Sequence, residues 1–183
     1  MDPGERPQDA DALSARFLAL SDRLTGTAFF VLGHREDARE AVQEAFVRCW
    51  RARDRARDVA DVDAWIFSVV LNTAKDARRR RRVRAAEALP AEDAMRATER
   101  EPDPADAAER RDALERVRGA IHQLPETERE VFLLRQNGDL TVEAIGAALG
   151  VPVGTAKTRM RTALRRLRDA IEPGSVKGRM PCR

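Results

Sequence analysis

Five consecutive arginines, Arg78–Arg82, form the densest group of chemically active side chains in the sequence. Lys75 lies three residues before them, so six cations fall within eight positions. Guanidinium and ammonium groups at this density bind phosphates, and an anionic partner relieves their mutual repulsion. The run therefore predicts contact with nucleic acid. The alternative is a helix end that carries charge for solubility and complements the helix dipole.

A second cationic group lies in TVEAIGAALGVPVGTAKTRMRTALRRLR, residues 141–168. The pattern predicts a helix over 141–149, a turn at 150–152 and a second helix to about residue 171, which is a helix-turn-helix arrangement. One stripe of the second helix is apolar and is expected to face the core: Ala156, Met160, Ala163, Leu164, Leu167 and Ile171. Its remaining surface carries hydroxyls and cations that suit the DNA major groove: Thr155, Lys157, Thr158, Arg161, Thr162 and Arg165.

Groups that could perform catalysis are scarce. The two cysteines, Cys49 and Cys182, are too few for a disulfide framework or a zinc site, and the two histidines lie far apart in the sequence. A hydrolase that uses paired carboxylates would need a nucleophile, a metal cluster or a phosphate-binding glycine loop, and none is recognisable. The sequence therefore predicts a protein that is not an enzyme and that needs no metal or cofactor.

The composition predicts an all-α protein. The chain has 183 residues, of which 34 are basic and 31 acidic, so the net charge is +3 although 36% of the residues are charged. Alanine, leucine, arginine and glutamate favour helices, while tyrosine is absent and β-branched runs are scarce. We find no apolar run long enough for a membrane span and no signal peptide, so a cytoplasmic, reduced protein is expected.

The clearest amphipathic helix covers Asp37–Arg51, DAREAVQEAFVRCWR. Its apolar residues recur with the 3.6-residue period of a single helix face. Phe46, Cys49 and Trp50 lie on that face and are expected in the core. A second helix is expected from about Asp63, beginning AWIFSVVLNTAKDA and continuing into the arginine run.

The chain divides into two helical halves. Seven of its eight aromatic residues precede residue 68, so an aromatic core and a separate aliphatic core are expected. Residues 85–112 are rich in acids and contain three prolines, which predicts a flexible acidic linker. The predicted organisation is a helical domain over 11–84, the linker over 85–112, a helix-turn-helix domain over 113–172 and a disordered tail over 173–183.

Four segments together resemble an extracytoplasmic-function (ECF) bacterial sigma factor. They are DAREAVQEAFVRCWR, DAWIFSVVLNTAKDARRRRR, LPETEREVFLLR and TVEAIGAALGVPVGTAKTRMRTALRRLR, in the order and spacing of that family. The resemblance implies a subunit that binds core RNA polymerase and directs it to promoters. Its first domain, similar to sigma region 2, would melt and read the −10 element, and its second, similar to region 4, would read the −35 element as duplex.

The resemblance also implies roles for individual residues. The polar face that docks on core polymerase is matched by Asp37, Gln43, Glu44 and Arg48. The polar residue of the pocket for an unstacked −10 base is matched by Asn72, and the phosphate contacts beside it by Lys75, Arg78, Arg79, Arg80, Arg81 and Arg82. The −35 readers are matched by Thr155, Lys157, Thr158 and Arg161, next to which the helix pattern places Arg165. The chain departs from the family by lacking tyrosine, and its linker is long and acidic.

Two classes of function stay open from the sequence. The first is the sigma factor, monomeric when free, with core RNA polymerase and promoter DNA as partners and a cognate anti-sigma factor as a further candidate. The second is a helix-turn-helix regulator that binds DNA without polymerase. A dimeric regulator binds a palindrome by itself, whereas a sigma factor needs polymerase and an asymmetric two-part site.

Overall fold

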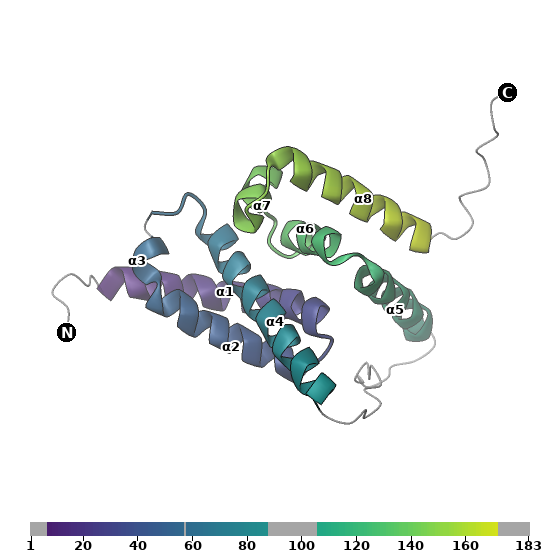
Figure 1. Cartoon of the computed structure of the whole chain (residues 1–183), viewed down its shortest axis with the longest axis horizontal. Coiled ribbons are helices and arrows are strands. Elements are labelled where there is room, and N and C mark those ends of the chain that lie inside the picture. The colour runs from purple at the N-terminus through teal and green to yellow at the C-terminus, as the bar shows by residue number, and fades with distance from the viewer. Residues whose placement is uncertain (1–6, 57, 88–105, 172–183) are drawn as a thin grey trace.

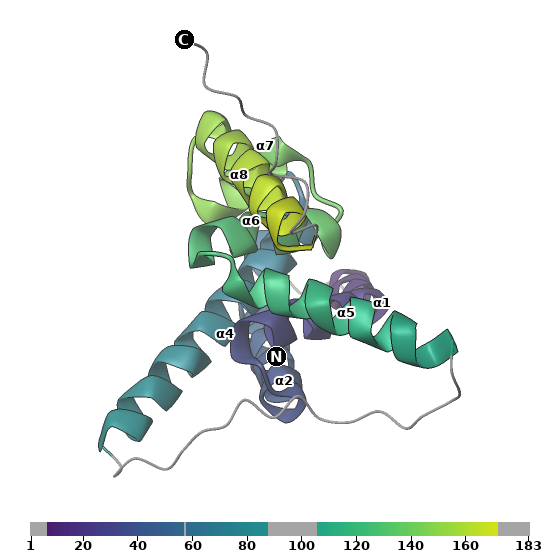
Figure 2. The ribbon, with the colours of Figure 1, turned by 90° about the vertical axis from the view of Figure 1, so that its right-hand side faces the viewer.

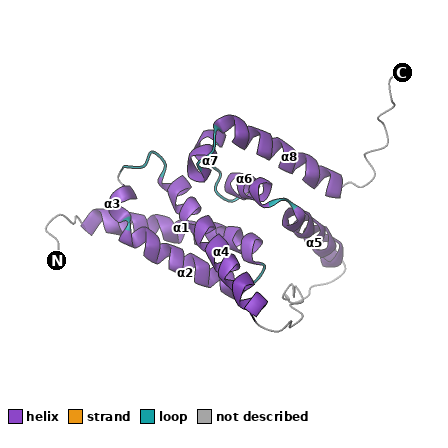
Figure 3. Cartoon of the chain, in the orientation of Figure 1, coloured by secondary structure: helices purple, strands orange, loops and turns teal. Residues whose placement is uncertain are grey.

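The computed structural model describes residues 7–56, 58–87 and 106–171 (Figure 1). Within these ranges the chain forms helices joined by short loops and turns, without a strand (Figure 3). The helices of this described part are α1 Pro7–Leu32, α2 Arg35–Arg51, α3 Arg53–Ala56, α4 Val62–Glu87, α5 Asp106–Gln123, α6 Glu126–Gln136, α7 Val142–Leu149 and α8 Val153–Ile171. The prediction of an all-α fold is confirmed.

The boundary between α1 and α2 follows from local sequence. Gly33 has a φ of 82°, a left-handed conformation that glycine adopts without a steric penalty, and its amide donates to the Phe29 carbonyl at 2.8 Å. Glu36 and Asp37 lie in the first turn of α2, while Arg48 and Arg51 lie in its last turn. Both pairs oppose the partial charges at the helix ends, so they stabilise α2.

The long helices α1, α2 and α4 share an apolar core. Leu24, Ile66 and Phe67 are completely buried, as is Cys49. Burial of a side chain of this size contributes roughly 1.5–3 kcal/mol. The first half of α4 is therefore held firmly between α1 and α2. Figure 2 shows the second half, which carries the arginine run, extending away from this bundle.

The start of α4 is fixed by two acidic residues. The Asp61 carboxylate accepts the amide of Ala64 at 2.9 Å, which satisfies one of the unpaired donors at the helix end. The Asp63 carboxylate accepts hydrogen bonds from Nε and Nη2 of Arg16 on α1. The distance between Nε and Oδ1 is 2.6 Å. The hydrogen bond to Asp63 is the main reason that the pKa of Arg16 is raised. This pair ties the beginning of α4 to α1.

The two halves of the chain are docked on one another. Figure 1 shows α1–α4 on one side and α6–α8 on the other. The buried apolar residues form one continuous cluster that runs from Leu13 in α1 to Leu167 in α8. The expectation of two separate cores is therefore wrong, because α4 packs against α6 and α7.

Helical structure extends into both ends of the predicted linker. The α4 helix continues to Glu87, and α5 begins at Asp106, within the segment 85–112. Residues 88–105 and the predicted tail lie outside the described residues, so the flexible linker and the disordered tail stay predictions. Among the apolar positions expected in the core, Leu164 and Ile171 are 48% and 41% exposed, while Phe46 and Trp50 are half-buried.

None of the helices in the described part of the chain is long and apolar enough to cross a membrane.

Candidate nucleic-acid interface

The basic face of α4 contains six cations that we first identified in the sequence: Lys75, Arg78, Arg79, Arg80, Arg81 and Arg82. All six lie on one continuous helix, so its 3.6-residue period distributes them around the helix surface. The side chain of Arg79 is 80% exposed, whereas that of Arg78 is only 18% exposed. The arginines of the run therefore differ in how far they are exposed to solvent, because they face different neighbours.

Two of these arginines reach back to α2. Nη2 of Arg80 lies 3.0 Å from Oε2 of Glu44, and Nη1 of Arg81 lies 3.1 Å from Oδ2 of Asp37. The two acceptors are residues for which the family resemblance predicts a role in core polymerase docking. The structure thus brings together two predicted sites, one for DNA and one for polymerase, that lie more than 30 residues apart in the sequence.

Glu44 is the centre of this network between α2 and α4. Oε1 of Glu44 accepts a hydrogen bond from Nη2 of Arg48 at 2.6 Å. Nη1 of Arg48 donates to Oδ2 of Asp76 on α4 at 3.3 Å. Burial acts to raise the pKa of Glu44, but the hydrogen bonds and charges of Arg48 and Arg80 together lower it. The hydrogen bond to Glu44 raises the pKa of Arg48. Both groups are therefore charged at neutral pH.

The remaining docking and base-pocket candidates face solvent. Gln43 is exposed on α2, close to the ion pairs of Glu44. Asn72 is exposed on α4, while its neighbours Leu71 and Thr73 are buried. An exposed amide at the end of an apolar run has room to meet a base that has left the DNA stack.

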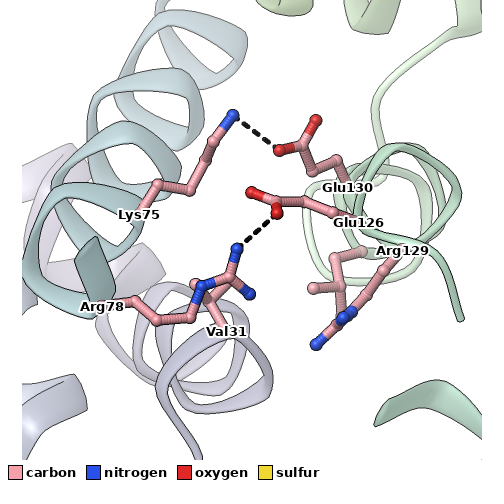
Figure 4. Close-up of a pocket in the computed structure, with 7 residues that line it drawn as sticks. Val31, Lys75, Arg78, Glu126, Arg129 and Glu130 are labelled. Carbon is pink, nitrogen blue, oxygen red and sulfur yellow. Dashed lines mark ion pairs between the residues drawn. The ribbon is translucent and has the colours of Figure 1, made fainter. Parts of the chain in front are cut away.

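Two cations of the basic face turn toward the second half of the chain (Figure 4). Nζ of Lys75 lies 2.7 Å from Oε1 of Glu130, and Nη2 of Arg78 lies 2.5 Å from Oε2 of Glu126. Both carboxylates belong to α6. The Oε1 atom of Glu130 is buried, and the geometry fits an ion pair rather than a directed hydrogen bond.

Sequence reasoning missed this acidic face of α6. Neither Glu126 nor Glu130 is among the site residues predicted from the sequence. The two residues are four apart on α6, which places them on one side of the helix. That spacing is the only sequence signal of the acidic face, and it does not identify the surface that the face meets.

The helix-turn-helix forms as predicted from α7 and α8. The Thr141 side chain caps α7 by accepting the amide of Ala144 at 3.1 Å, and Gly150 ends the helix with a φ of 64°. A side chain at Gly146 would bring its Cβ to 3.0 Å from the carbonyl oxygen of Val151. Close packing between α7 and the turn therefore fixes the direction of α8.

The solvent face of α8 carries the predicted upstream readers. Lys157, Arg161 and Arg165 recur every four residues and are exposed. Thr158 is also exposed, and its hydroxyl donates to the Gly154 carbonyl at 2.9 Å, which leaves the hydroxyl oxygen able to accept. Thr155 is half-buried at the beginning of the helix. These residues share one helix, and the ammonium of Lys157 also lies 3.7 Å from Glu143 of α7.

Comparison with known protein families agrees with this two-part arrangement. Residues 17–84 match the family described as Sigma-70 region 2, and residues 120–169 match Sigma-70 region 4. The ECF RNA polymerase sigma factor RpoE of Cereibacter sphaeroides is 36% identical over 135 residues, which cover 72% of this chain and 71% of that protein.

The chain belongs to the ECF RNA polymerase sigma factors. As such it binds core RNA polymerase and directs transcription initiation at specific promoters, and the family is not enzymatic. The alternative of a regulator that acts without polymerase is not supported, since the first half matches region 2.

Further relatives agree with this assignment. The ECF RNA polymerase sigma factor SigE of Mycolicibacterium smegmatis is 31% identical over 150 residues, which cover 81% of this chain and 57% of SigE. The fold is similar to that of the sigma factor RpoE in complex with the anti-sigma factor NepR from Bartonella quintana, with a TM-score of 0.68, 20% identity and coverage of 88% and 97% of the two chains. The fold is also similar to that of CnrH in complex with the cytosolic domain of CnrY, with a TM-score of 0.62 and 24% identity. The match covers 92% of this chain and 95% of that chain.

Proposed function

We propose that this ECF sigma factor reads the upstream promoter element with the exposed row Lys157, Arg161 and Arg165 on α8. The observation that supports this role is the row itself, on the solvent face of the second helix of a helix-turn-helix. Arginine and lysine donate to guanine O6 and N7 in the major groove, while hydroxyls and further cations contact phosphates. The Thr155 hydroxyl is suited to the second role, whereas the Thr158 oxygen, whose proton is donated to the Gly154 carbonyl, is suited to accept from a base amino group.

The downstream role belongs to α4 under this proposal. Arg79 and Arg82 are exposed and hold backbone phosphates of the −10 strand, together with the other cations of the basic face. Asn72 meets the extruded base. Removing a base from its stack costs a few kcal/mol, so an exposed polar side chain beside a row of phosphate contacts helps to offset that cost.

The polar face of α2 docks on core polymerase under the same proposal. Asp37, Glu44 and Arg48 are held in fixed geometry by α4, and Gln43 is exposed beside them. Preorganised charges lose little conformational freedom on binding, which favours a docking surface over a loosely solvated face. We further propose a cytoplasmic location and, because two similar folds occur in complexes with other proteins, regulation by an anti-sigma factor.

Substitution of Arg161 tests the upstream role. Reconstituted holoenzyme with Arg161→Ala should lose discrimination at one or two upstream base pairs, because one base-edge contact contributes roughly 1–3 kcal/mol. Binding is measured on a promoter and on its single-base variants. Arg118→Ala removes an exposed arginine of α5 and is the matched control, expected to keep wild-type preference. A uniform loss on all templates would make Arg161 a phosphate contact instead.

A further inference from the structure

The row of cations on α8 lies on a helix whose buried face is built mostly from small side chains. We call this row, Lys157, Arg161 and Arg165, the reading row. The buried residues of α8 are Ala156, Ala163 and Leu167. Alanine lets α8 lie close to α6 and α7, but it offers no ridge that interlocks with the grooves of a neighbouring helix. Apolar packing therefore defines the position of α8 better than its rotation about its own axis.

Recognition of base edges depends on that rotation. The side chains of a binding site must be held within roughly 10–20° of their productive geometry. Rotation of α8 about its axis would turn the guanidinium of Arg161 away from the base edges in the major groove and toward the phosphates beside them. A contact that fixes the rotation of α8 therefore acts on sequence discrimination, although it does not touch DNA.

One charged pair joins α8 to α6 in this way. Nε of Arg166 on α8 lies 2.9 Å from Oε2 of Glu128, in the first turn of α6. The Glu128 side chain is only 12% exposed, whereas that of Arg166 is 54% exposed. Oε2 is buried and has no directed hydrogen bond within the described residues, so the nearby charge of Arg166 compensates its own.

This pair differs from an ordinary ion pair on the surface. Lys157 lies 3.7 Å from Glu143, but these two side chains are 63% and 65% exposed, and such pairs contribute little. Separation of Arg166 from Glu128 instead leaves a largely buried carboxylate without a compensating charge, which is strongly unfavourable. Because Arg166 directly follows Arg165 of the reading row on one continuous helix, rotation of α8 carries Arg166 away from Glu128.

We propose that Glu128 is a positioning residue for recognition of the upstream promoter element. Through Arg166 it fixes the rotation of α8, so that the reading row meets base edges rather than phosphates. The inference rests on the proposed function, because it requires that this row reads bases. Both members of the pair lie within the range 120–169 that matches Sigma-70 region 4, so the contact involves no residue of α1–α4.

A direct phosphate contact by Arg166 is the competing interpretation, because its side chain is half exposed. The two roles predict different results when Glu128 loses its charge. If Arg166 holds a phosphate, its release from Glu128 strengthens binding to every DNA sequence and steepens the salt dependence by about 0.9 in log–log slope. If Glu128 positions α8, discrimination between sequences falls while binding to random DNA is unchanged.

The test removes the charge of Glu128 in the full chain. Glu128→Gln retains the size of the side chain. Glu115→Gln is the matched control, because Glu115 forms an exposed ion pair with Arg118, 2.7 Å away on α5. Reconstituted holoenzyme is titrated at several salt concentrations with a promoter, with its single-base variants in the upstream element and with random duplex DNA. Circular dichroism and thermal unfolding of the free chain report helicity and stability.

A second variant separates positioning from stability. Glu128→Leu with Arg166→Leu replaces the ion pair by apolar packing, a change that is often neutral or stabilising. We expect this apolar double variant to unfold no earlier than the wild-type chain but to lose upstream discrimination. Full discrimination by the double variant would overturn the proposal, because it would show that any packing between α6 and α8 is sufficient.

We expect Glu128→Gln to reduce discrimination at one or more upstream base pairs about fivefold, the lower end of what a base-edge contact contributes. In a chain that already carries Arg161→Ala, Glu128→Gln should cause no further loss at the base pair that Arg161 reads, since it acts through that residue. Discrimination equal to that of the Glu115→Gln control overturns the proposal. So does uniformly tighter binding to all templates.

Arg161→Ala alone separates this proposal from the function on which it rests. Full discrimination by Arg161→Ala at every upstream base pair would show that the reading role of α8 is wrong. Relaxed discrimination by Arg161→Ala, together with control-like discrimination by Glu128→Gln, would retain the reading role and reject only the positioning role of Glu128.

Discussion

Nη2 of Arg80 on α4 lies 3.0 Å from Oε2 of Glu44 on α2. Glu44 belongs to the proposed polymerase-docking face and Arg80 to the basic face proposed for DNA. Because one carboxylate serves both Arg48 and Arg80, a change on either face alters the charge that the other face presents. Docking on polymerase and holding the −10 strand are therefore expected to be coupled through Glu44.

Reversal of the charges on the docking face tests the proposed docking role of Glu44 and Arg48. Glu44→Lys with Arg48→Glu should weaken competition for core polymerase by tenfold or more, since truncating or reversing desolvated charge pairs at interfaces costs about 2–5 kcal/mol. The new lysine also repels Arg80, so a modest loss of stability is expected. Competition against a labelled reference sigma factor for core polymerase measures the effect.

The matched control exchanges Glu36 and Arg39, an exposed pair 2.7 Å apart on α2. This exchange should leave competition at the wild-type level. Equal competition by the Glu44/Arg48 variant and wild type would show that α2 docks through another face.

Asn72→Ala should separate promoter binding from promoter opening. The variant loses the polar group that meets the flipped base, but it retains the phosphate contacts of Arg79 and Arg82. Closed complexes should form nearly normally, while permanganate-reactive thymines in the −10 region decrease. A premelted bubble removes the unpairing cost and should partly restore the variant. Normal melting of duplex promoter by Asn72→Ala would leave Asn72 with a structural role only.

Local patterns in the sequence were sufficient to predict the helices that carry the site. The apolar period of α2 and the turn at Gly150 locate α2, α7 and α8 to within a few residues. The roles assigned to Asn72, Glu44 and Arg161 come from resemblance to the family, and they stay predictions. The structure adds that Asn72 and Arg161 are exposed and that Glu44 is held in ion pairs.

Contacts between the two halves could not be predicted in the same way. The pairing of Lys75 with Glu130 joins residues 55 positions apart, and no local pattern encodes it. The apolar face of α8 was predicted too broadly, because Leu164 and Ile171 lie at the edge of the stripe that packs on α6 and α5. Helix periodicity predicts which side of a helix is buried, but the width of the buried face depends on neighbours that are distant in sequence.

Stability should decrease below neutral pH because of His122. This half-buried ring packs against Phe29 and Phe30, with centroids 6.3 Å and 5.5 Å away. Burial, and then the charge of Arg129, lower the pKa of His122 below its ordinary value of 6.5. The unfolded chain therefore binds the proton more readily than the folded one, so the free energy of unfolding falls as the pH drops below about 6.5.

Urea unfolding between pH 7.5 and 5.5 measures this effect. His122→Gln should flatten the dependence over that interval, whereas His34→Gln, at the start of α2, should retain it. Identical slopes for wild type and His122→Gln would contradict this origin of the pH dependence.

Cys49 should be chemically inert in the folded protein. It is completely buried in α2, and burial raises its pKa to about 12. Only the thiolate reacts, so labelling near neutral pH should be on the order of a thousand times slower than in urea. A Cys182→Ser background leaves Cys49 as the single thiol, and reaction with a coloured disulfide reagent gives the rate. Rapid native labelling would show that the α1–α2–α4 core opens readily.

We expect this chain to select a two-part promoter only as a subunit of RNA polymerase. Run-off transcription from a randomised template library, with purified core polymerase and this chain, measures this selection. The transcribed templates should share two unlike sequence elements at fixed spacing, and Arg161→Ala should change the upstream element alone. Selection of a single palindrome, by the chain with or without polymerase, would show instead that the chain binds DNA as a symmetric dimer.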